Sequence, residues 1–327
     1  MLRKNSLMQQ YHNLKESGST SDFPLLLANV LHKLLLMKFK GVPSPWKSYT
    51  WQTELNDFKT ANRVIMDEAP DLQRVTEESP YQDSKIKDNG YSILLETWGR
   101  TFTVGRRAII NDDLEALRRQ PERFGRAAAR TLAKNCVLGI EADGPTYDGL
   151  SLFASGHKGG INFGANTTLA NTSAAINAVS TAMTKVAQSK DETGEKLGLT
   201  PKYLLTCPEL EDAALRITQG QSFIPVNTDG GTTQVGKAAR LEVLMEPFFT
   251  SATESYVIAD PEDAPFLEVG FLDGQQTPDL LVKRINAVNL AGGDDEWGYE
   301  FDDIEFKIRW DFAVQRAMYQ GIYRISS

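Results

Sequence analysis

Histidine is the first residue type to test for chemistry, because it serves both as a catalytic base and as a metal ligand. The chain has His12, His32 and His157, and no two of them stand at the spacing of paired metal ligands. The fragment closest to a catalytic motif is Ser155-Gly156-His157, but a nucleophile elbow reads Gly-x-Ser-x-Gly, which the sequence lacks. We therefore interpret this fragment as a turn.

Two further clusters contain ligand-type residues without the order that a known site requires. The glycines between Gly156 and Gly160 do not follow the Gly-x-x-x-x-Gly-Lys-Ser/Thr order of a phosphate loop. An acidic cluster near the carboxyl end lacks the spacing of an EF-hand and is more typical of a solvated turn. Its members are Asp294, Asp295, Glu296, Asp302 and Asp303.

Cysteine usage also gives no sign of a metal or redox site. Cys136 and Cys207 are far apart in sequence and neither has a second ligand nearby, so we expect two buried thiols. The sequence thus predicts no catalytic residue, no cofactor and no metal, and hence no enzyme. A hydrolase with an unrecognised site stays an alternative, because carboxylate pairs can meet in space without being close in sequence.

The composition is that of an ordinary globular protein with one large domain or two smaller ones. Hydrophobic residues make up 41% of the 327 residues and charged residues 24%. The longest apolar stretch, Leu25 to Phe39, is interrupted by polar residues and is too short to cross a membrane. Residues 1–14 do not form a secretory signal, so we expect production in a cytoplasm. The net charge of -8 argues against a nucleic-acid clamp but suits a wall that encloses DNA and touches it weakly.

Two long helical patterns are predicted in the first half of the chain. Asp22 can cap a helix that continues to Lys40 and has apolar residues at three- and four-residue spacing. These include Leu26, Val30, Leu34 and Met37. Further on, Asp112 and Glu115 form a capping-box pattern, and Pro121 is expected to interrupt that helix and begin another. The new helix has one apolar stripe, made of Phe124, Ala128, Leu132, Cys136 and Ile140.

Between these helices, residues 58–104 have the pattern of a long hairpin. Strand-like segments flank a middle section, Asp67 to Gly90, that is crowded with charged residues, Pro and Ser. Burying so many charges inside one subunit would be costly, so the tip is either solvated or paired with charges on a neighbour.

The second half of the chain alternates short strands with helices, which is typical of a mixed α/β module. A helix is predicted from Thr172 to Gln188, a buried strand from Tyr203 to Thr206, and a further helix from Pro208 to Ile217. Residues 227–236 are glycine-rich and are expected to form a loop. A strictly alternating strand with one buried face runs from Ile304 to Phe312, and an extended segment follows from Ala317 to Ile325.

Several short motifs, taken in order, are similar to those of one family. They are Ser21-Asp22-Phe23-Pro24-Leu25-Leu26, Arg107-Ala108-Ile109-Ile110-Asn111-Asp112-Asp113, Gly125-Arg126-Ala127-Ala128, Asp148-Gly149 with Leu152-Phe153 and His157, Leu204-Leu205-Thr206-Cys207-Pro208-Glu209-Leu210-Glu211, Gly270-Phe271-Leu272-Asp273-Gly274-Gln275-Gln276-Thr277-Pro278 and Arg309-Trp310-Asp311-Phe312. From about Ser21 to Tyr323 the chain resembles the Mu-like branch of tailed-phage major head proteins. Trp310 departs from the polar residue usual there, but keeps the strand alternation.

The resemblance implies an α+β fold of the Hong Kong 97 capsid type. Such a fold has an N-terminal arm, an extended E-loop hairpin, a peripheral domain with a long spine helix and a β-sheet, and an axial domain. The implied boundaries are 1–48 for the arm, 49–106 for the E-loop hairpin with flanking peripheral strands, 107–190 for the peripheral domain with the spine helix, 191–294 for the axial domain and 295–327 for the C-terminal strands of the peripheral domain.

The resemblance also implies where neighbouring subunits meet. The helix from Asp22 resembles the arm that reaches a neighbour, although its periodicity suits an ordinary core helix equally well. The charged hairpin resembles the E-loop that overlaps the next subunit. The predicted intersubunit contacts are Phe23, Leu26, Val30, Leu34, Glu77, Glu78, Lys85 and Lys87. Some relatives crosslink a lysine to a neighbour's asparagine, but no motif here identifies the asparagine or a catalytic glutamate, and no crosslink is predicted.

The function implied is that of a major capsid protein, which self-assembles into pentamers and hexamers of an icosahedral head around phage double-stranded DNA. Its expected partners are itself, a portal, a scaffold or maturation protease, decoration proteins and DNA held weakly without sequence specificity, with no membrane. We expect it in the virion capsid, assembled in the cytoplasm of a bacterial host. An encapsulin compartment of the same fold is the alternative, and would be expected to have a groove for a cargo peptide.

Overall fold

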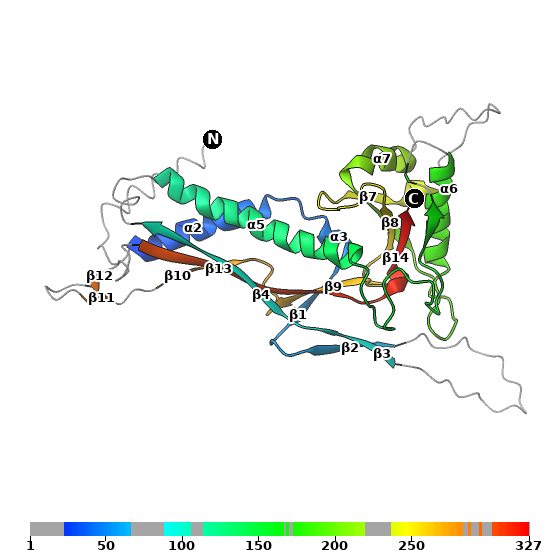
Figure 1. The fold of residues 1–327 in the computed structure, drawn as a ribbon, viewed down its shortest axis with the longest axis horizontal. Coiled ribbons are helices and arrows are strands. Elements are labelled where there is room, and N and C mark those ends of the chain that lie inside the picture. The colour runs from blue at the N-terminus through cyan, green and yellow to red at the C-terminus, as the bar shows by residue number, and fades with distance from the viewer. Residues whose placement is uncertain are drawn as a thin grey trace, which may run out of the picture. The chain divides into compact units, whose positions relative to one another are not determined.

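The structure is a computed structural model, and it describes residues 23–66, 88–105, 114–166, 168–169, 173–219, 237–283, 287–288, 294–295 and 303–326. Its contacts divide the chain into two units, each of which is assembled from separate stretches of sequence (Figure 1). Unit 1 comprises Met1–Pro43, Thr97–Thr131 and Gln275–Asp311. Unit 2 comprises Ser44–Glu96, Leu132–Gly274 and Phe312–Ser327.

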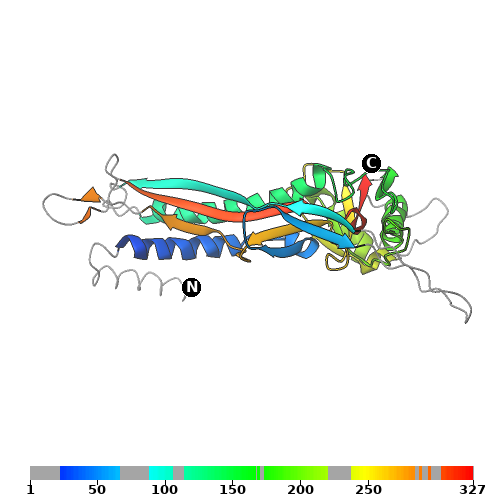
Figure 2. The ribbon, with the colours of Figure 1, turned by 90° about the horizontal axis from the view of Figure 1, so that it is seen from below.

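Unit 1 packs two helices against a small sheet (Figure 2). The helices are α2 (Phe23–Lys40) and the first part of α5 (Leu114–Glu141). The strands are β4 (Glu96–Gly105), β10 (Asp279–Val282) and the first part of β13 (Asp303–Arg316). β10 runs antiparallel to β13, and β4 also pairs with β13. A separate pair consists of β11 (Ala287–Val288) and β12 (Asp294–Asp295).

The core of unit 1 joins α2 to the sheet through apolar side chains. The ring of Phe102 on β4 stacks on Phe306 of β13 with centroids 5.0 Å apart, and on Phe124 of α5 at 5.2 Å. Along β13, Phe306, Ile308 and Trp310 are buried at every second position. The predicted alternating strand is confirmed, and its buried face supplies much of this core.

The predicted interruption at Pro121 is wrong, because α5 is one helix from Leu114 to Glu141 with this proline inside it. An internal proline removes one main-chain hydrogen bond and strains the preceding turn. The apolar stripe of the same helix offsets that cost, since Leu132, Cys136 and Ile140 are completely buried. The predicted stripe is confirmed at these positions, and Pro121 is itself buried.

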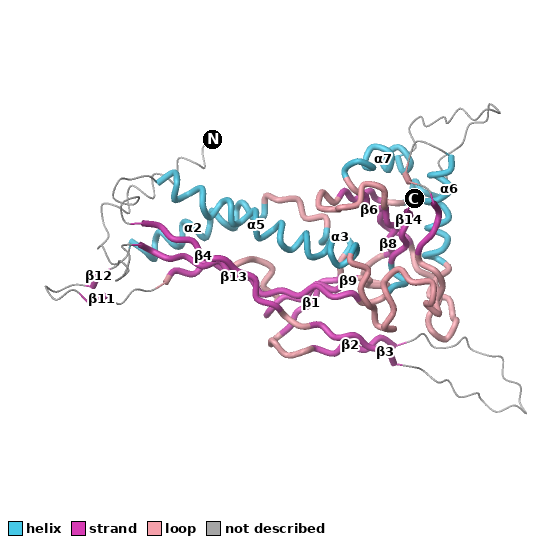
Figure 3. Tube along the Cα trace, viewed as in Figure 1, coloured by secondary structure: helices cyan, strands magenta, loops and turns pink. Residues whose placement is uncertain are grey.

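Unit 2 contains a hairpin, a sheet that includes the end of β13, and a second sheet of five strands (Figure 3). After the short helix α3 (Trp46–Tyr49), β1 (Trp51–Leu55) runs parallel to β9 (Leu267–Leu272). β9 pairs on its other side with Phe312–Arg316 of β13, in antiparallel orientation. The predicted hairpin is present as β2 (Ala61–Met66) and β3 (Asp88–Ile93), which are antiparallel.

The five-stranded sheet has the order β5-β14-β8-β6-β7. The strands are β5 (Phe163–Asn166), β6 (Pro201–Thr206), β7 (Glu242–Met245), β8 (Ser255–Ala259) and β14 (Ile322–Ser326). Helices α6 (Ser173–Ala187) and α7 (Glu211–Gln219) pack on the sheet and share its core. Short 3-10 turns precede three of these elements, at Pro208–Leu210, Lys237–Arg240 and Tyr319–Gly321.

This second sheet does not follow the sequence-based domain boundaries. The boundary at residues 190 and 191 separates α6 from β6 and β8, yet Val179 of α6 is in the same core as Leu204 and Val257. The last strand, assigned to the peripheral domain with residues 295–327, instead pairs with β8 and β5. Local sequence patterns identify a strand but do not specify its partner, which explains both differences.

Some sequence-based predictions lie outside the described residues, namely the capping residue Asp112, most of the hairpin tip and the loop 227–236. Among the helices that the structure does describe, none has a stretch long and apolar enough to cross a membrane.

Gly125 lies where α5 meets α2, and it supplies a stability test for unit 1. A Cβ atom there would clash with the main-chain oxygen of Leu35. At an exposed helical position, alanine is more favourable than glycine by about 1 kcal/mol. At this close contact the clash should outweigh that gain, so we expect Gly125→Ala to lower the free energy of unfolding by about 1–3 kcal/mol. Urea unfolding followed by circular dichroism measures the change.

Gly105→Ala is the matched control, because an added Cβ at Gly105 meets nothing within 4 Å. Its effect should stay within about 0.5 kcal/mol. Equal effects of the two substitutions would mean that close approach of the two helices does not limit residue 125.

Candidate functional site

The predicted contact residues of the arm fall on α2. Val30 and Leu34 pack against the core of unit 1, and Leu34 is 8% exposed. The opposite face of this helix includes Lys33 and Met37, and Met37 is 56% exposed. Phe23 and Leu26 lie in the same helix, but their side chains are not described. Leu34, one of the predicted intersubunit contacts, therefore packs inside its own subunit.

The hairpin β2–β3 has two faces that alternate along both strands. Arg63 and Tyr91 are cross-strand partners on the inner face, and Ile93 on the same face is buried. The outer face is open, since Val64 is 61% exposed and Leu94, just after β3, is 50% exposed. The predicted contacts nearer the tip, Glu77, Glu78, Lys85 and Lys87, lie outside the described residues.

The inner face of the hairpin is held to β9 by one buried carboxylate, that of Glu268. Its Oε1 accepts hydrogen bonds from Nε of Arg63 at 3.0 Å, from Nη2 of Arg63 at 2.8 Å and from the Thr53 hydroxyl at 2.5 Å. Its Oε2 accepts a hydrogen bond from the Tyr91 hydroxyl at 2.5 Å. Burial and this hydrogen bond to Glu268 raise the pKa of Tyr91, so the hydroxyl stays protonated as a donor.

Sequence reasoning missed Glu268 altogether. Its signal is a single acidic residue inside the apolar strand Leu267–Leu272, and the glutamate is completely buried. Buried carboxylates need partners, so this residue predicts donors from elsewhere in the fold. The sequence does not identify those donors, because Arg63 and Thr53 are more than 200 residues away.

His157, the histidine of the Ser155-Gly156-His157 fragment, is buried. Its Nδ1 lies 2.6 Å from Oδ2 of Asp148, and its ring stacks on Tyr319 with centroids 3.8 Å apart. Burial raises the pKa of Asp148, but hydrogen bonds from His157, Thr146 and the Leu150 amide outweigh it and lower the pKa overall. Ser155 is exposed in a turn, as predicted. This arrangement orders the loop around His157.

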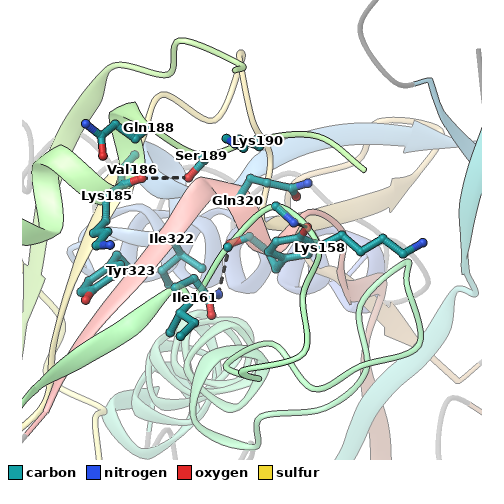
Figure 4. Close-up of a pocket in the computed structure, with 14 residues that line it drawn as sticks. Lys158, Ile161, Lys185, Val186, Gln188, Ser189, Lys190, Gln320, Ile322 and Tyr323 are labelled. Carbon is teal, nitrogen blue, oxygen red and sulfur yellow. Dashed lines mark hydrogen bonds between the residues drawn. The ribbon is translucent and has the colours of Figure 1, made fainter. Parts of the chain in front are cut away.

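A cavity of about 290 Å³ lies next to this loop, between the end of α6 and β14 (Figure 4). Lys158, Lys185 and Lys190 lie on different sides of it, and Lys158 pairs with Glu192 at 3.2 Å. The residues that line this cavity include no acid, histidine or cysteine. Within the described parts of the chain, no cluster of three or more His, Cys, Asp or Glu side chains is arranged to hold a metal ion.

A second buried acid, Glu246, follows β7 and is completely shielded from solvent. The Tyr49 hydroxyl is 3.5 Å from its Oε2, and Oε1 has no hydrogen-bond partner among the described residues. Burial is the main cause that raises the pKa of Glu246 to about 7. Burial also raises the pKa of Cys136, and the negative charge of Glu246 adds to this rise. Both cysteines are buried free thiols, as predicted.

The comparisons with known proteins agree with this architecture. The family model described as "Phage capsid protein" matches residues 90–325, which is most of the chain. The chain belongs to this family. It is therefore a structural subunit of a phage capsid shell, as the sequence motifs predicted. No curated protein matches the chain at a significant level.

Solved structures with the same fold are distant in sequence. A chain from Mycobacterium phage Adephagia has 15% identity and a TM-score of 0.56, over 87% of this chain and 90% of that one. A chain from Gordonia phage Cozz has 11% identity and a TM-score of 0.53, over 86% of each chain. The capsid of an empty GTA particle has 10% identity and a TM-score of 0.52, over 86% of this chain and 89% of that one. The predicted α+β fold of the Hong Kong 97 type is confirmed.

The raised pKa of Glu246 predicts a pH dependence of capsid-subunit stability. Folding keeps the proton on this carboxyl, so its contribution is largest below pH 4.5 and is lost as the pH rises toward about 7. Between pH 5 and pH 8, urea unfolding of the full chain should lose about 2–3 kcal/mol from this group. Glu246→Gln, which cannot ionise, should remove that part of the slope and stabilise the subunit at pH 8. Equal slopes for the two proteins would contradict the prediction.

Proposed function

We propose that this capsid protein forms pentamers and hexamers that close into an icosahedral head around the double-stranded DNA of a tailed phage. The observation that carries the proposal is the family match over residues 90–325, which includes parts of both units. The proposed role is geometric, because identical chains must make related contacts in rings of five and six. We also propose that the protein has no catalytic function.

Two segments are proposed to join neighbouring subunits. The first is the arm, where Phe23 and Leu26 precede the part of α2 whose side chains are described. Since Leu34 is buried within unit 1, the face of α2 that carries Met37 is the better candidate surface for a neighbour. The second segment is the hairpin tip with Glu77, Glu78, Lys85 and Lys87, whose mixed charges can pair with charges on the next subunit.

The partners follow from the same role. A net charge of -8 leaves the shell wall little attraction for phosphate, so contact with packaged DNA is weak and independent of base sequence. We further propose a portal, a scaffold or maturation protease and decoration proteins as partners, and assembly in the cytoplasm of the bacterial host.

Electron microscopy of the purified full-length protein tests the proposed assembly. We expect closed icosahedral particles, together with a rapidly sedimenting species in an analytical ultracentrifuge. A chain that stays monomeric at all concentrations, or that turns over a substrate, would overturn the proposal. Particles that retain a cellular protein cargo and never DNA would instead favour an encapsulin.

The hairpin tip can be removed without disturbing its base, because Met66 and Asp88 are the last pair of the described register. Replacing residues 67–87 with Asn-Gly joins these strands through a two-residue turn of the type that suits a twisted hairpin. We expect a soluble, folded subunit that fails to close shells, measured by sedimentation and microscopy.

A full-length variant tests the charges of the tip separately from its length. It replaces Glu77, Glu78, Lys85 and Lys87 with glutamine. Loss of shells in the shortened variant alone means that length matters more than ion pairs, and loss in both assigns the contact to the charges. Normal shells from the shortened variant would exclude the tip as a clamp.

A further inference from the structure

The β2–β3 hairpin touches the rest of unit 2 through a small apolar contact and one polar cluster. The apolar contact includes Ala61, Ile93 and Leu55. The polar cluster consists of Glu268 on β9, Arg63 on β2, Tyr91 on β3 and Thr53 on β1. Arg63 and Tyr91 are direct cross-strand partners, so Glu268 binds both strands of the hairpin at the same position along their length.

We infer that Glu268 is a positioning residue that fixes the hairpin on the sheet and thereby sets the direction in which the hairpin tip reaches a neighbouring subunit. The inference rests on the proposed function, since it concerns how a shell contact is aimed. Glu268 itself is completely buried within its own subunit.

The apolar surroundings of Glu268 on β9 support a positioning role for this residue. Leu267 and Val269 on either side of it are also completely buried, so an apolar residue at position 268 would satisfy the strand itself. A buried charge costs free energy unless donors surround it, and replacing a whole buried ion pair with apolar residues often leaves stability unchanged. What the carboxylate adds is a requirement for particular donors at particular places.

That requirement excludes displaced positions of the hairpin. Side chains alternate between the two faces of a strand, so a shift of one residue would turn Arg63 and Tyr91 to the open face that now carries Val64. Glu268 would then be buried without its charged partner, a state that costs much more than the intact cluster. An apolar contact of Ala61 and Ile93 alone has no comparable direction, because the hydrophobic effect depends on buried area and is non-directional.

Both oxygens of the carboxylate accept hydrogen bonds, and this also limits rotation of the hairpin on the sheet. Oε1 receives the guanidinium of Arg63 and the Thr53 hydroxyl, while Oε2 receives the Tyr91 hydroxyl from the opposite strand. A tilt of the hairpin that shortens one set of hydrogen bonds lengthens the other. The hairpin is thus held against both sliding and tilting.

Hydrogen–deuterium exchange on the full-length chain tests the anchoring. In Glu268→Gln and in Arg63→Met, main-chain amides of residues 61–66 and 88–93 should exchange roughly tenfold to a hundredfold faster. Amides of β6 and β8 should keep their wild-type rates. Arg63→Lys, which keeps the charge but loses the two-pronged geometry, should restore part of the protection.

Lys202→Met is the control, because it removes an ion pair of unit 2 with Asp260 that is more exposed and distant in sequence from the hairpin. It should change neither hairpin exchange nor shell closure. If Glu268→Gln speeds exchange across β6 and β8 as well, the residue is a general stabiliser and the positioning role is wrong. Arg63→Met tests the same anchoring at a less buried position, because the Arg63 side chain is 30% exposed whereas that of Glu268 is completely buried.

Shell formation gives the second measurement. If wild-type chains close uniform shells, Glu268→Gln and Arg63→Met should lower the yield of closed shells roughly tenfold or broaden their size, with Tyr91→Phe intermediate. Normal shells from loosened hairpins would overturn the positioning role while leaving the proposed function intact. Wild-type chains that never form shells would overturn the proposed function, and unchanged hairpin exchange would independently overturn the anchoring.

Discussion

A charge that is shielded from water must receive hydrogen bonds from its surroundings, and in this protein the carboxylate of Glu268 receives them from three separate strands. This constraint ties β1, β2 and β3 to β9, although these elements are distant in sequence. The sheet pairing of β1 with β9 would survive without it, since main-chain hydrogen bonds supply that pairing. The location of the hairpin on the sheet would not be specified, and a shell protein depends on where its extensions point.

One strand, β13, and one helix, α5, have parts in both units and so have different neighbours in each unit. β13 pairs with β10 through its first half in unit 1, and with β9 through its second half in unit 2. α5 likewise contributes Phe124 to the core of unit 1 and buries Ile140 in unit 2.

The sequence allows the local elements to be predicted well, because their periodicity is strong. The alternation around Phe306 and Ile308 and the four-residue spacing of Leu132 and Cys136 are direct records of one buried face. The capsid fold itself came from the order of motifs. The break expected at Pro121 did not occur, because burial along the rest of the helix outweighs a local preference.

Pairing between distant segments was the part that the sequence did not reveal. β1 is too polar to stand out, the partners of Glu268 lie in other parts of the chain, and nothing in Ser173–Ala187 indicates which sheet that helix covers. Such information resides in complementary surfaces and appears only when the chain is folded. For the same reason the described residues place Leu34 inside the subunit, where periodicity alone left either side of α2 open.

The position of β14 as the second strand of the five-stranded sheet has a consequence for synthesis. β14 lies between β5 and β8, so β5 has no neighbour in that sheet until residues 322–326 have left the ribosome. A nascent chain that still lacks this strand cannot complete the sheet. The strand that joins β5 to β8 is therefore made after all the other strands of this sheet.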